Sequence, residues 1–220
     1  MKRFIIIIAA VMLAAVCCKE SNGMLYRTLV PGFMQDNGSM LADDGNTYLF
    51  NNPTMPEAFL KAKRVVALMD VIDAVDGQEK TFNAMMLEYA LPVYKDPAEC
   101  STTEEIEALG KDPVNVTNIW YSGGCLNLQN VIMIGPDPEV KHTISLAMSP
   151  VTAESDTLHF TLCHDAAADA TLGDLDGLTR YSFYSSFPIK DLLPETGSRV
   201  VELKWFWDEE WNSKYNTISR

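Results

Sequence analysis

The chain has 220 residues, of which 47% are hydrophobic and 21% are charged, and its formal net charge is −13. This apolar content is enough for one or two packed domains and excludes intrinsic disorder. Acidic residues are spread along the chain and no basic stripe is present, which argues against nucleic acid as a partner, because binding to phosphates depends on Lys and Arg replacing counterions.

The N-terminus has the layout of an export signal. Lys2 and Arg3 precede an unbroken apolar run of 13 residues, Phe4–Val16, and polar residues follow the two cysteines after it. A helix of this length rises roughly 20 Å at about 1.5 Å per residue, whereas the hydrocarbon core of a bilayer is about 30 Å thick. We therefore predict that residues 1–17 are a signal peptide and not a membrane span.

Adjacent cysteines, Cys17 and Cys18, close this leader. Bonded cysteines usually have Cα atoms about 4.4–6.8 Å apart, and neighbours across a trans peptide lie about 3.8 Å apart, so a disulfide between them is not expected. Small residues followed by a cysteine resemble the lipobox of bacterial lipoproteins, in which the cysteine becomes the acylated N-terminus. Cys18 is the predicted attachment site because Cys17 before it is small; Cys17, which follows branched Val16, is the alternative.

A cysteine carrying several acyl chains holds a protein firmly on a membrane, at about 0.8 kcal/mol per buried CH₂. The predicted location is therefore the cell envelope, lipid-anchored, with the outer membrane favoured over the inner and the face left open. The alternative is that the leader is a plain signal peptide and that the mature chain is a free periplasmic protein.

Residues 18–35 carry little pattern and are predicted to be a spacer between lipid and body. A strand-dominated domain is predicted over residues 36–95, where turn signals such as Asp43–Asn46 and Asp76-Gly77 separate apolar runs. Thr54 and Glu57 are spaced to cap a short helix within it.

Residues 96–112 interrupt this pattern and are predicted to be an acidic linker with one or two helical turns, because Thr102 and Glu105 form a second capping pair and Gly110 follows as a stop. From residue 113 onward apolar strands return, separated by turns such as Ser122–Gly124. Residues 113–220 are therefore predicted to be an antiparallel β-sandwich, and the fold class is all-β.

Several segments in this order resemble the NigD-like lipoproteins of Bacteroidetes. The segments "DPVNVTNIWYSGGCLNLQ", "KHTISL" and "LCHDAAADA" resemble the family's C-terminal β-sandwich, and "LADDGNTYLF" with "AKRVVALMDVID" resembles its N-terminal domain. The resemblance implies a small OB-like barrel over residues 36–95. It implies little about mechanism, because the family takes its name from association with a bacteriocin and its biochemical role is unsettled.

The Cys163-His164-Asp165 run suggests a thiol triad, but neighbouring residues on a strand point to opposite faces, so we do not expect Cys163 and His164 to act together. His164 and Asp169 are expected to meet across a strand-end turn, with His142 joining them, either as a hydrogen-bonded lock or as a ligand site. No zinc spacing is present, and we predict no metal and no cofactor.

Trp211 follows three acidic residues near the end of the chain and is expected to be exposed, whereas Trp205 and Trp207 share a face with Leu203 and are expected in the core. An exposed indole beside carboxylates suits stacking on a sugar or capping a cationic peptide. Trp211, His164, Asp169 and His142 are therefore the candidate ligand-binding residues.

The predicted function is a non-catalytic binding or interaction module in the cell envelope, with the membrane as one partner through the lipid anchor and envelope proteins or glycans as others. Three alternatives stay open: a glycan-binding accessory protein, an envelope hydrolase with spatially paired carboxylates, and a bacteriocin-associated or immunity protein.

Overall fold

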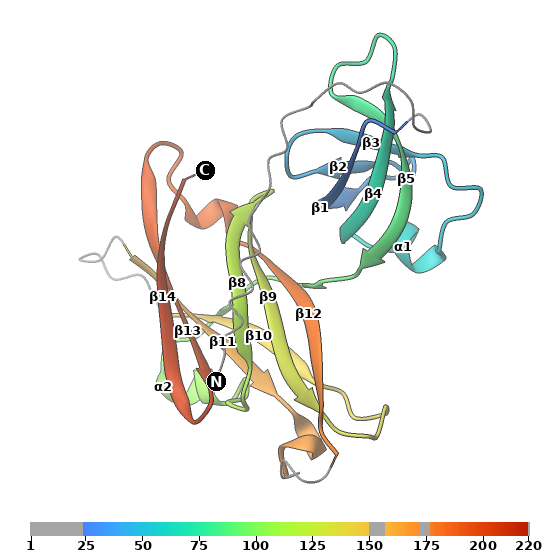
Figure 1. The fold of residues 1–220 in the computed structure, drawn as a ribbon. Helices are drawn as coiled ribbons and strands as arrows, with labels where there is room; N and C mark the ends of the chain where they lie inside the picture. The colour runs from blue at the N-terminus through green and yellow to red at the C-terminus, as the bar shows by residue number, and fades with distance from the viewer. Residues whose placement is uncertain (1–23, 150–156, 172–176, 220) are drawn as a thin grey trace, which may run out of the picture.

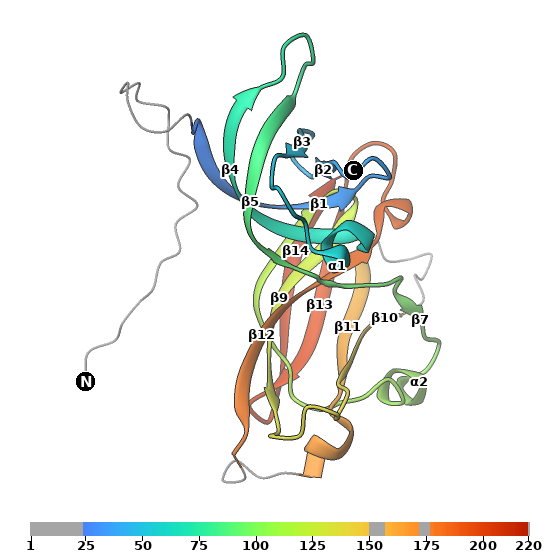
Figure 2. The same cartoon turned by 90° about the vertical axis from the view of Figure 1, so that its right-hand side faces the viewer.

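A computed structural model describes residues 24–149, 157–171 and 177–219 of the chain. Figures 1 and 2 show an N-terminal barrel standing at one end of a larger β-sandwich. Within the described residues, no helix has the length and apolar character needed to cross a membrane. Both leader cysteines, Cys17 and Cys18, lie outside the described residues.

The N-terminal body is a closed barrel in the strand order β1-β2-β3-β5-β4, which confirms the predicted small N-terminal β-barrel. Inward-facing side chains alternate along the strands, as Val65, Ala67, Met69 and Val71 of β4 show, and α1 adds Phe59 to the same core. The elements are β1 (Tyr26–Met34), β2 (Met40–Ala42), β3 (Thr47–Phe50), α1 (Glu57–Lys61), β4 (Arg64–Ala74) and β5 (Thr81–Ala90).

The barrel begins earlier than the sequence pattern indicated. Residues 26–34 were assigned to the spacer over 18–35, but they form β1, which pairs with both β2 and β4 and closes the barrel. The segment lacks a clear alternation because Pro31 and Gly32 interrupt it, although Gly32 is needed where the strand passes against Leu41 and Ala42 of β2. The predicted cap of α1 also differs, since the helix begins after Pro56 without a side-chain cap.

The C-terminal body consists of two packed sheets. One has the order β14-β13-β11-β10-β7 and the other the order β6-β12-β9-β8. Their strands are β6 (Val93–Tyr94), β7 (Ala98–Glu99), β8 (Asn115–Ser122), β9 (Cys125–Ile134), β10 (Thr143–Met148), β11 (Thr157–Asp165), β12 (Thr179–Pro188), β13 (Ser198–Trp207) and β14 (Glu210–Ser219), with short 3₁₀ helices η1 (Ala167–Thr171) and η2 (Lys190–Leu192).

The all-β class and the sandwich are confirmed, but the pairing is not purely antiparallel. β11 runs parallel to β13, and the short strands β7 and β6 run parallel to β10 and β12. Between β11 and β13 the chain crosses to the other sheet as β12 and then returns, and a connection that changes sheets leaves its two ends free to run in the same direction. Local hairpin signals carry no information on such a crossover.

The sandwich core lies between the two sheets. Leu158, Phe160 and Leu162 of β11 share the inner face as predicted, each at most 2% exposed. Leu203 is buried with them and Trp205 packs against the same core.

The predicted acidic linker belongs to the sandwich, because β7 pairs with β10 and α2 (Thr103–Glu107) packs on β11. Thr102 and Glu105 form the expected capping box, with each side chain bonded to the other residue's backbone N–H. The apolar side of the segment, Ile106 and Leu109, packs against buried Cys100 and Cys163. The acidic composition of residues 96–112 therefore indicated only the solvent-exposed side of this segment.

A buried polar network joins barrel and sandwich. The Arg64 guanidinium donates two hydrogen bonds of 2.6 Å to the Asp43 carboxylate, and both side chains are almost fully buried. Arg64 also donates to Asn127 of β9 at 3.0 Å, and the Ser122 hydroxyl of β8 donates to Asp43 at 2.5 Å. Gly123 lies against Asp43, so that any Cβ there would collide with the carboxylate. The two bodies therefore dock through paired charges at a specific register.

Candidate functional site

The outer face of the five-stranded sheet presents side chains in register across three strands. His159 and Thr161 of β11 lie opposite residues of β13, and these lie opposite β14. One row runs Thr161, Lys204, Ser213, and Phe206 and Trp211 face each other one row further on. This face is turned away from the core, so its polar residues are free to form a site.

A pocket of about 380 Å³ lies on this face at the end of the sandwich away from the barrel. One wall is α2 with the loop after it, the floor is β11 and β13, and the other wall is the beginning of β14, whose hairpin with β13 ends beside α2 in Figure 1. The lining residues are Thr103, Ile106, Glu107, Gly110, Lys111, Thr161, Cys163, Lys204, Trp211, Asn212 and Ser213.

Trp211 is 57% exposed and forms the rim of this pocket, at the start of β14. Its ring packs against Phe206 at a centroid distance of 5.5 Å, which supports one face of the indole while the pocket side stays accessible. The exposure agrees with the expectation from sequence. Trp211 therefore combines a large exposed apolar surface with an adjacent concave, partly polar wall, which is a common arrangement in ligand sites.

The α2 wall depends on Gly110, which ends the helical segment. Gly110 has φ of +105° and lies directly against the backbone of His164, where a Cβ would collide with the carbonyl group. Two residues further on, the Asp112 N–H donates a hydrogen bond to the His164 carbonyl oxygen at 2.8 Å. The wall of the pocket is thereby hydrogen-bonded to β11.

Cys163 and His164 point to opposite faces of β11, as strand geometry predicted. Cys163 lies under α2, where its thiol contacts the Ile106 carbonyl oxygen at 3.6 Å, and burial raises the pKa of this thiol to about 11. A thiol with this pKa is neutral at physiological pH and is a poor nucleophile. His164 faces the core, 1% exposed. The Cys163-His164-Asp165 run is therefore not a catalytic arrangement.

His142, His164 and Asp169 come together in one hydrogen-bonded chain. Asp169 Oδ2 lies 2.9 Å from His142 Nε2, His142 Nδ1 lies 2.9 Å from His164 Nε2, and His164 Nδ1 lies 2.9 Å from the Pro113 carbonyl oxygen. Gly135 N–H also donates to Asp169 Oδ2, at 2.5 Å. The predicted meeting of His164 with Asp169 thus occurs through His142 rather than directly.

Two groups of this chain have lowered pKa values. The Gly135 and His142 hydrogen bonds lower the pKa of Asp169, and burial lowers the pKa of His164. All four imidazole nitrogens have internal partners, so the chain fastens the segments around η1 to β10 and β11.

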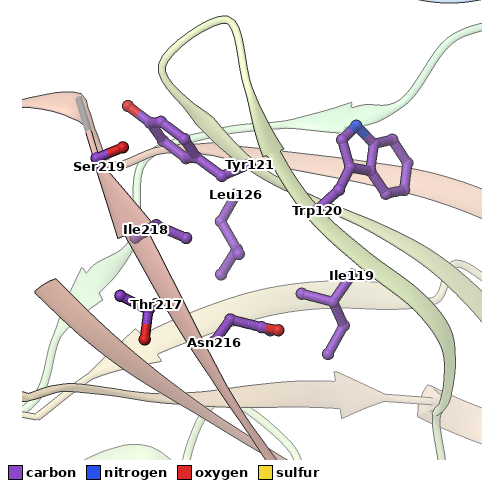
Figure 3. Close-up of a pocket in the computed structure, with 8 residues that line it drawn as sticks. All are labelled: Ile119, Trp120, Tyr121, Leu126, Asn216, Thr217, Ile218 and Ser219. Atoms are coloured by element: carbon purple, nitrogen blue, oxygen red, sulfur yellow. The ribbon is translucent and has the colours of Figure 1, made fainter. Parts of the chain in front are cut away.

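A second pocket, of about 370 Å³, opens on the side of the sandwich between the edge strands β8 and β14 (Figure 3). In Figure 3, Leu126 and Ile218 lie between the two strands, while Trp120 lies on the other side of β8, where it packs edge-on against Tyr184. Leu126 and Ile218 belong to the sandwich core. This pocket is therefore an opening into the core and holds none of the residues proposed from the sequence.

The sequence pattern missed most of the Trp211 pocket. Thr161 and Lys204 lie in predicted strands, Ser213 follows the last predicted strand, and Ile106 lies in the predicted linker. None of them is marked as a site residue, because their proximity depends on the pairing of β11, β13 and β14. The alternation along each strand was the available signal, since it marks them as facing outward. The three described cysteines, Cys100, Cys125 and Cys163, are free and buried.

Comparisons with known proteins support the same architecture. The chain resembles a solved protein of unknown function from Bacteroides vulgatus with a TM-score of 0.66 and 17% identity, over 89% of this chain and 91% of that chain. It resembles a candidate lipoprotein from Bacteroides fragilis with a TM-score of 0.65 and 14% identity, over 88% and 97% of the two chains.

A NigD-like immunity protein from Bacteroides caccae is similar with a TM-score of 0.58 and 16% identity, over 89% of this chain and 94% of that chain. No curated protein sequence matches. At these identities the structural likenesses establish the fold alone. The model of the NigD-like C-terminal β-sandwich domain, however, matches residues 97–219, which is more than half of the sequence. The chain therefore belongs to the NigD-like family.

Proposed function

We propose that the mature chain is a lipid-anchored, non-catalytic binding protein of the cell envelope, tethered through Cys18, with the Trp211 pocket as its ligand site. The observation that carries this proposal is a 57% exposed indole standing over a pocket of about 380 Å³. Such a ring is costly to leave in water, and the pocket beside it offers both apolar contact and hydrogen bonds to a ligand.

The titratable groups near the pocket favour binding over catalysis. The Cys163 thiol is held neutral by burial, and the nitrogens of His142 and His164 are bonded to each other, to Asp169 and to the Pro113 carbonyl oxygen. A general base needs a nitrogen within reach of the substrate proton. These groups act instead as fixed parts of the wall and of the sandwich end behind it.

The envelope location rests on the leader and on the shared fold with the candidate lipoprotein from Bacteroides fragilis. The test is fractionation of cells that express the full chain. We expect Cys18→Ala to leave the membrane fraction and Cys17→Ala to stay in it. A Cys18→Ala protein that stays wholly with membranes would contradict the anchor.

The ligand site is tested by retention on the organism's own envelope polysaccharide and cell-wall fractions. We expect Trp211→Ala to lose retention that the unchanged mature protein shows. Tyr181→Ala is the matched control, because Tyr181 is a similarly exposed aromatic residue, 51% exposed, on the other sheet. Equal retention of all three proteins would reject the Trp211 pocket as the site.

Immunity to a bacteriocin is a second candidate, favoured by the likeness to the Bacteroides caccae immunity protein. Expression in a bacteriocin-sensitive strain tests it directly. Protection that is abolished by Trp211→Ala would assign the pocket to the toxin, and the absence of protection would remove this candidate.

A further inference from the structure

Beyond the Trp211 pocket, the outer face of the sheet continues along β14 to a row of three directly opposed residues. His159 of β11 faces Glu202 of β13, and Glu202 faces Tyr215 of β14. Tyr215 is 61% exposed and lies four residues after Trp211, on the same face of the strand. At about 3.4 Å per residue, the two rings are separated by roughly 14 Å along β14. A ligand that contacts both rings is therefore longer than a single sugar unit.

Glu202 holds the second ring in position. The Tyr215 hydroxyl donates to Glu202 Oε1 at 2.5 Å, and His159 Nδ1 lies 2.6 Å from Oε2. Glu202 is only 4% exposed. Burial raises the pKa of its carboxyl, but the hydrogen bonds from Tyr215 and His159 outweigh burial and leave the pKa below its usual value. The ionised carboxylate is thus used internally, and the Tyr215 ring lies exposed on the outer face of the sheet.

The lysines that line the pocket are each paired with a carboxylate, although the chain as a whole carries a net charge of −13. Lys204 Nζ lies 3.7 Å from Glu202, and Lys111 Nζ lies 3.6 Å from Glu107. The charged side chains that line the pocket are therefore used within the protein, and the exposed carboxylates of residues 208–210, in the turn before Trp211, disfavour an acidic polymer. The Trp211 pocket and the adjoining face of β14 therefore favour a neutral ligand.

The wall between the two rings offers hydrogen bonds. Thr161 and Ser213 place hydroxyl groups in the row between Trp211 and Tyr215. The Asn212 amide instead donates to the carbonyl oxygens of Trp207 and Glu210 and holds the turn before Trp211. Sugars present apolar C–H faces that stack on aromatic rings and hydroxyl groups that pair with such side chains. Two aromatic platforms with neutral polar groups between them match a chain of sugars better than a peptide, which would leave backbone groups to satisfy.

We propose that the outer face of β14, from the Trp211 pocket to Tyr215, binds a linear, neutral oligosaccharide. Trp211 and Tyr215 are the stacking platforms, and Glu202 is the positioning residue for Tyr215. This inference rests on the proposed function of the Trp211 pocket and adds the class, charge and length of the ligand. Trp211 contacts every bound chain, whereas Tyr215 contacts only chains long enough to reach it.

The test is calorimetric titration of the mature protein with neutral gluco-, manno- and xylo-oligosaccharides, from mono- to hexasaccharide. In at least one series we expect Kd to fall about tenfold, which corresponds to roughly 1.4 kcal/mol, once the chain reaches Tyr215. Tyr215→Ala should remove this gain and leave the affinity for short chains unchanged. Trp211→Ala should weaken binding at every length.

Two further variants separate position from contact. Tyr215→Phe keeps the ring but loses the hydrogen bond to Glu202, so we expect it to retain part of the gain with length, while Tyr181→Ala should retain all of it. Affinity independent of chain length, or binding confined to uronate-containing or basic chains, overturns the inference. So does the failure of every neutral series. Envelope retention that does not change in Trp211→Ala would instead overturn the proposed function itself.

Discussion

The two ends of the β-sandwich use polar side chains in opposite ways. At the barrel end, the Arg64 and Asp43 side chains are buried and bond to each other and to polar side chains of the sandwich. At the α2 end, Lys204 and Trp211 face an open pocket. Buried charges are tolerated only when they are paired, so the Arg64–Asp43 network fixes the position of the barrel on the sandwich. The Trp211 pocket, in contrast, is open and can offer its polar groups to a ligand.

The largest effect is expected where the closed network is broken. Arg64→Ala leaves the Asp43 carboxylate buried without its partner, which should lower the free energy of unfolding by about 3–5 kcal/mol. Urea denaturation, followed separately in barrel and sandwich, measures it. The double variant Arg64→Met with Asp43→Leu removes both charges and should lose less. An equal loss in the double variant would show that shape, not charge pairing, stabilises the junction.

A smaller effect is expected at acidic pH from the His142, His164 and Asp169 chain. Burial lowers the folded-state pKa of His164, so the unfolded state binds protons first as the pH falls. The contribution of neutral His164 to the free energy of unfolding is complete above the pKa of about 6.5 that histidine has in the unfolded state, and it is lost progressively below that pH.

Urea midpoints measured from mildly alkaline solution down to about pH 5 test this. His164→Gln cannot titrate and should give a flatter profile with lower stability at neutral pH. A profile as steep as that of the unchanged protein would assign the acid sensitivity to other groups.

The smallest effect is expected at the wall of the open pocket. Thr102→Ala removes one half of the capping box and should destabilise α2 by about 1 kcal/mol. Because α2 covers Cys163, the variant should also react faster with a thiol reagent in the native state. Thr103→Ala is the matched control, since Thr103 lies in the helix without a capping role. Equal reactivity in both variants would mean that α2 does not protect the thiol.

Individual residues show how far the sequence could be interpreted. Alternation placed Leu158, Phe160 and Leu162 in the core and set Cys163 and His164 on opposite faces, because side-chain direction along a strand has a fixed period of two. The capping pair of Thr102 and Glu105 was equally local and correct. By contrast, β1 was assigned to a spacer, since Pro31 and Gly32 hide its pattern until its two neighbours are in place.

The candidate site shows the same division. The exposure of Trp211 followed from its place after a charged turn. The grouping of His142, His164 and Asp169 was also expected, although His164 reaches Asp169 only through His142. The partners of Trp211 did not follow, because Thr161 and Lys204 reach it only through the parallel pairing of β11 with β13. That pairing depends on a crossover through the other sheet, which no local signal encodes.

By itself, the sequence determined the all-β class, the two-body order, the faces of the strands and the exposed indole, because each depends on local geometry or on composition. Only the tertiary structure decided which strands are neighbours, that the Arg64–Asp43 pair bonds to Asn127 and Ser122 of the sandwich, and that Tyr215 lies opposite Glu202. The physical reason is that these relations join residues far apart in the chain, and their energy exists only once the sheets have closed around a common core.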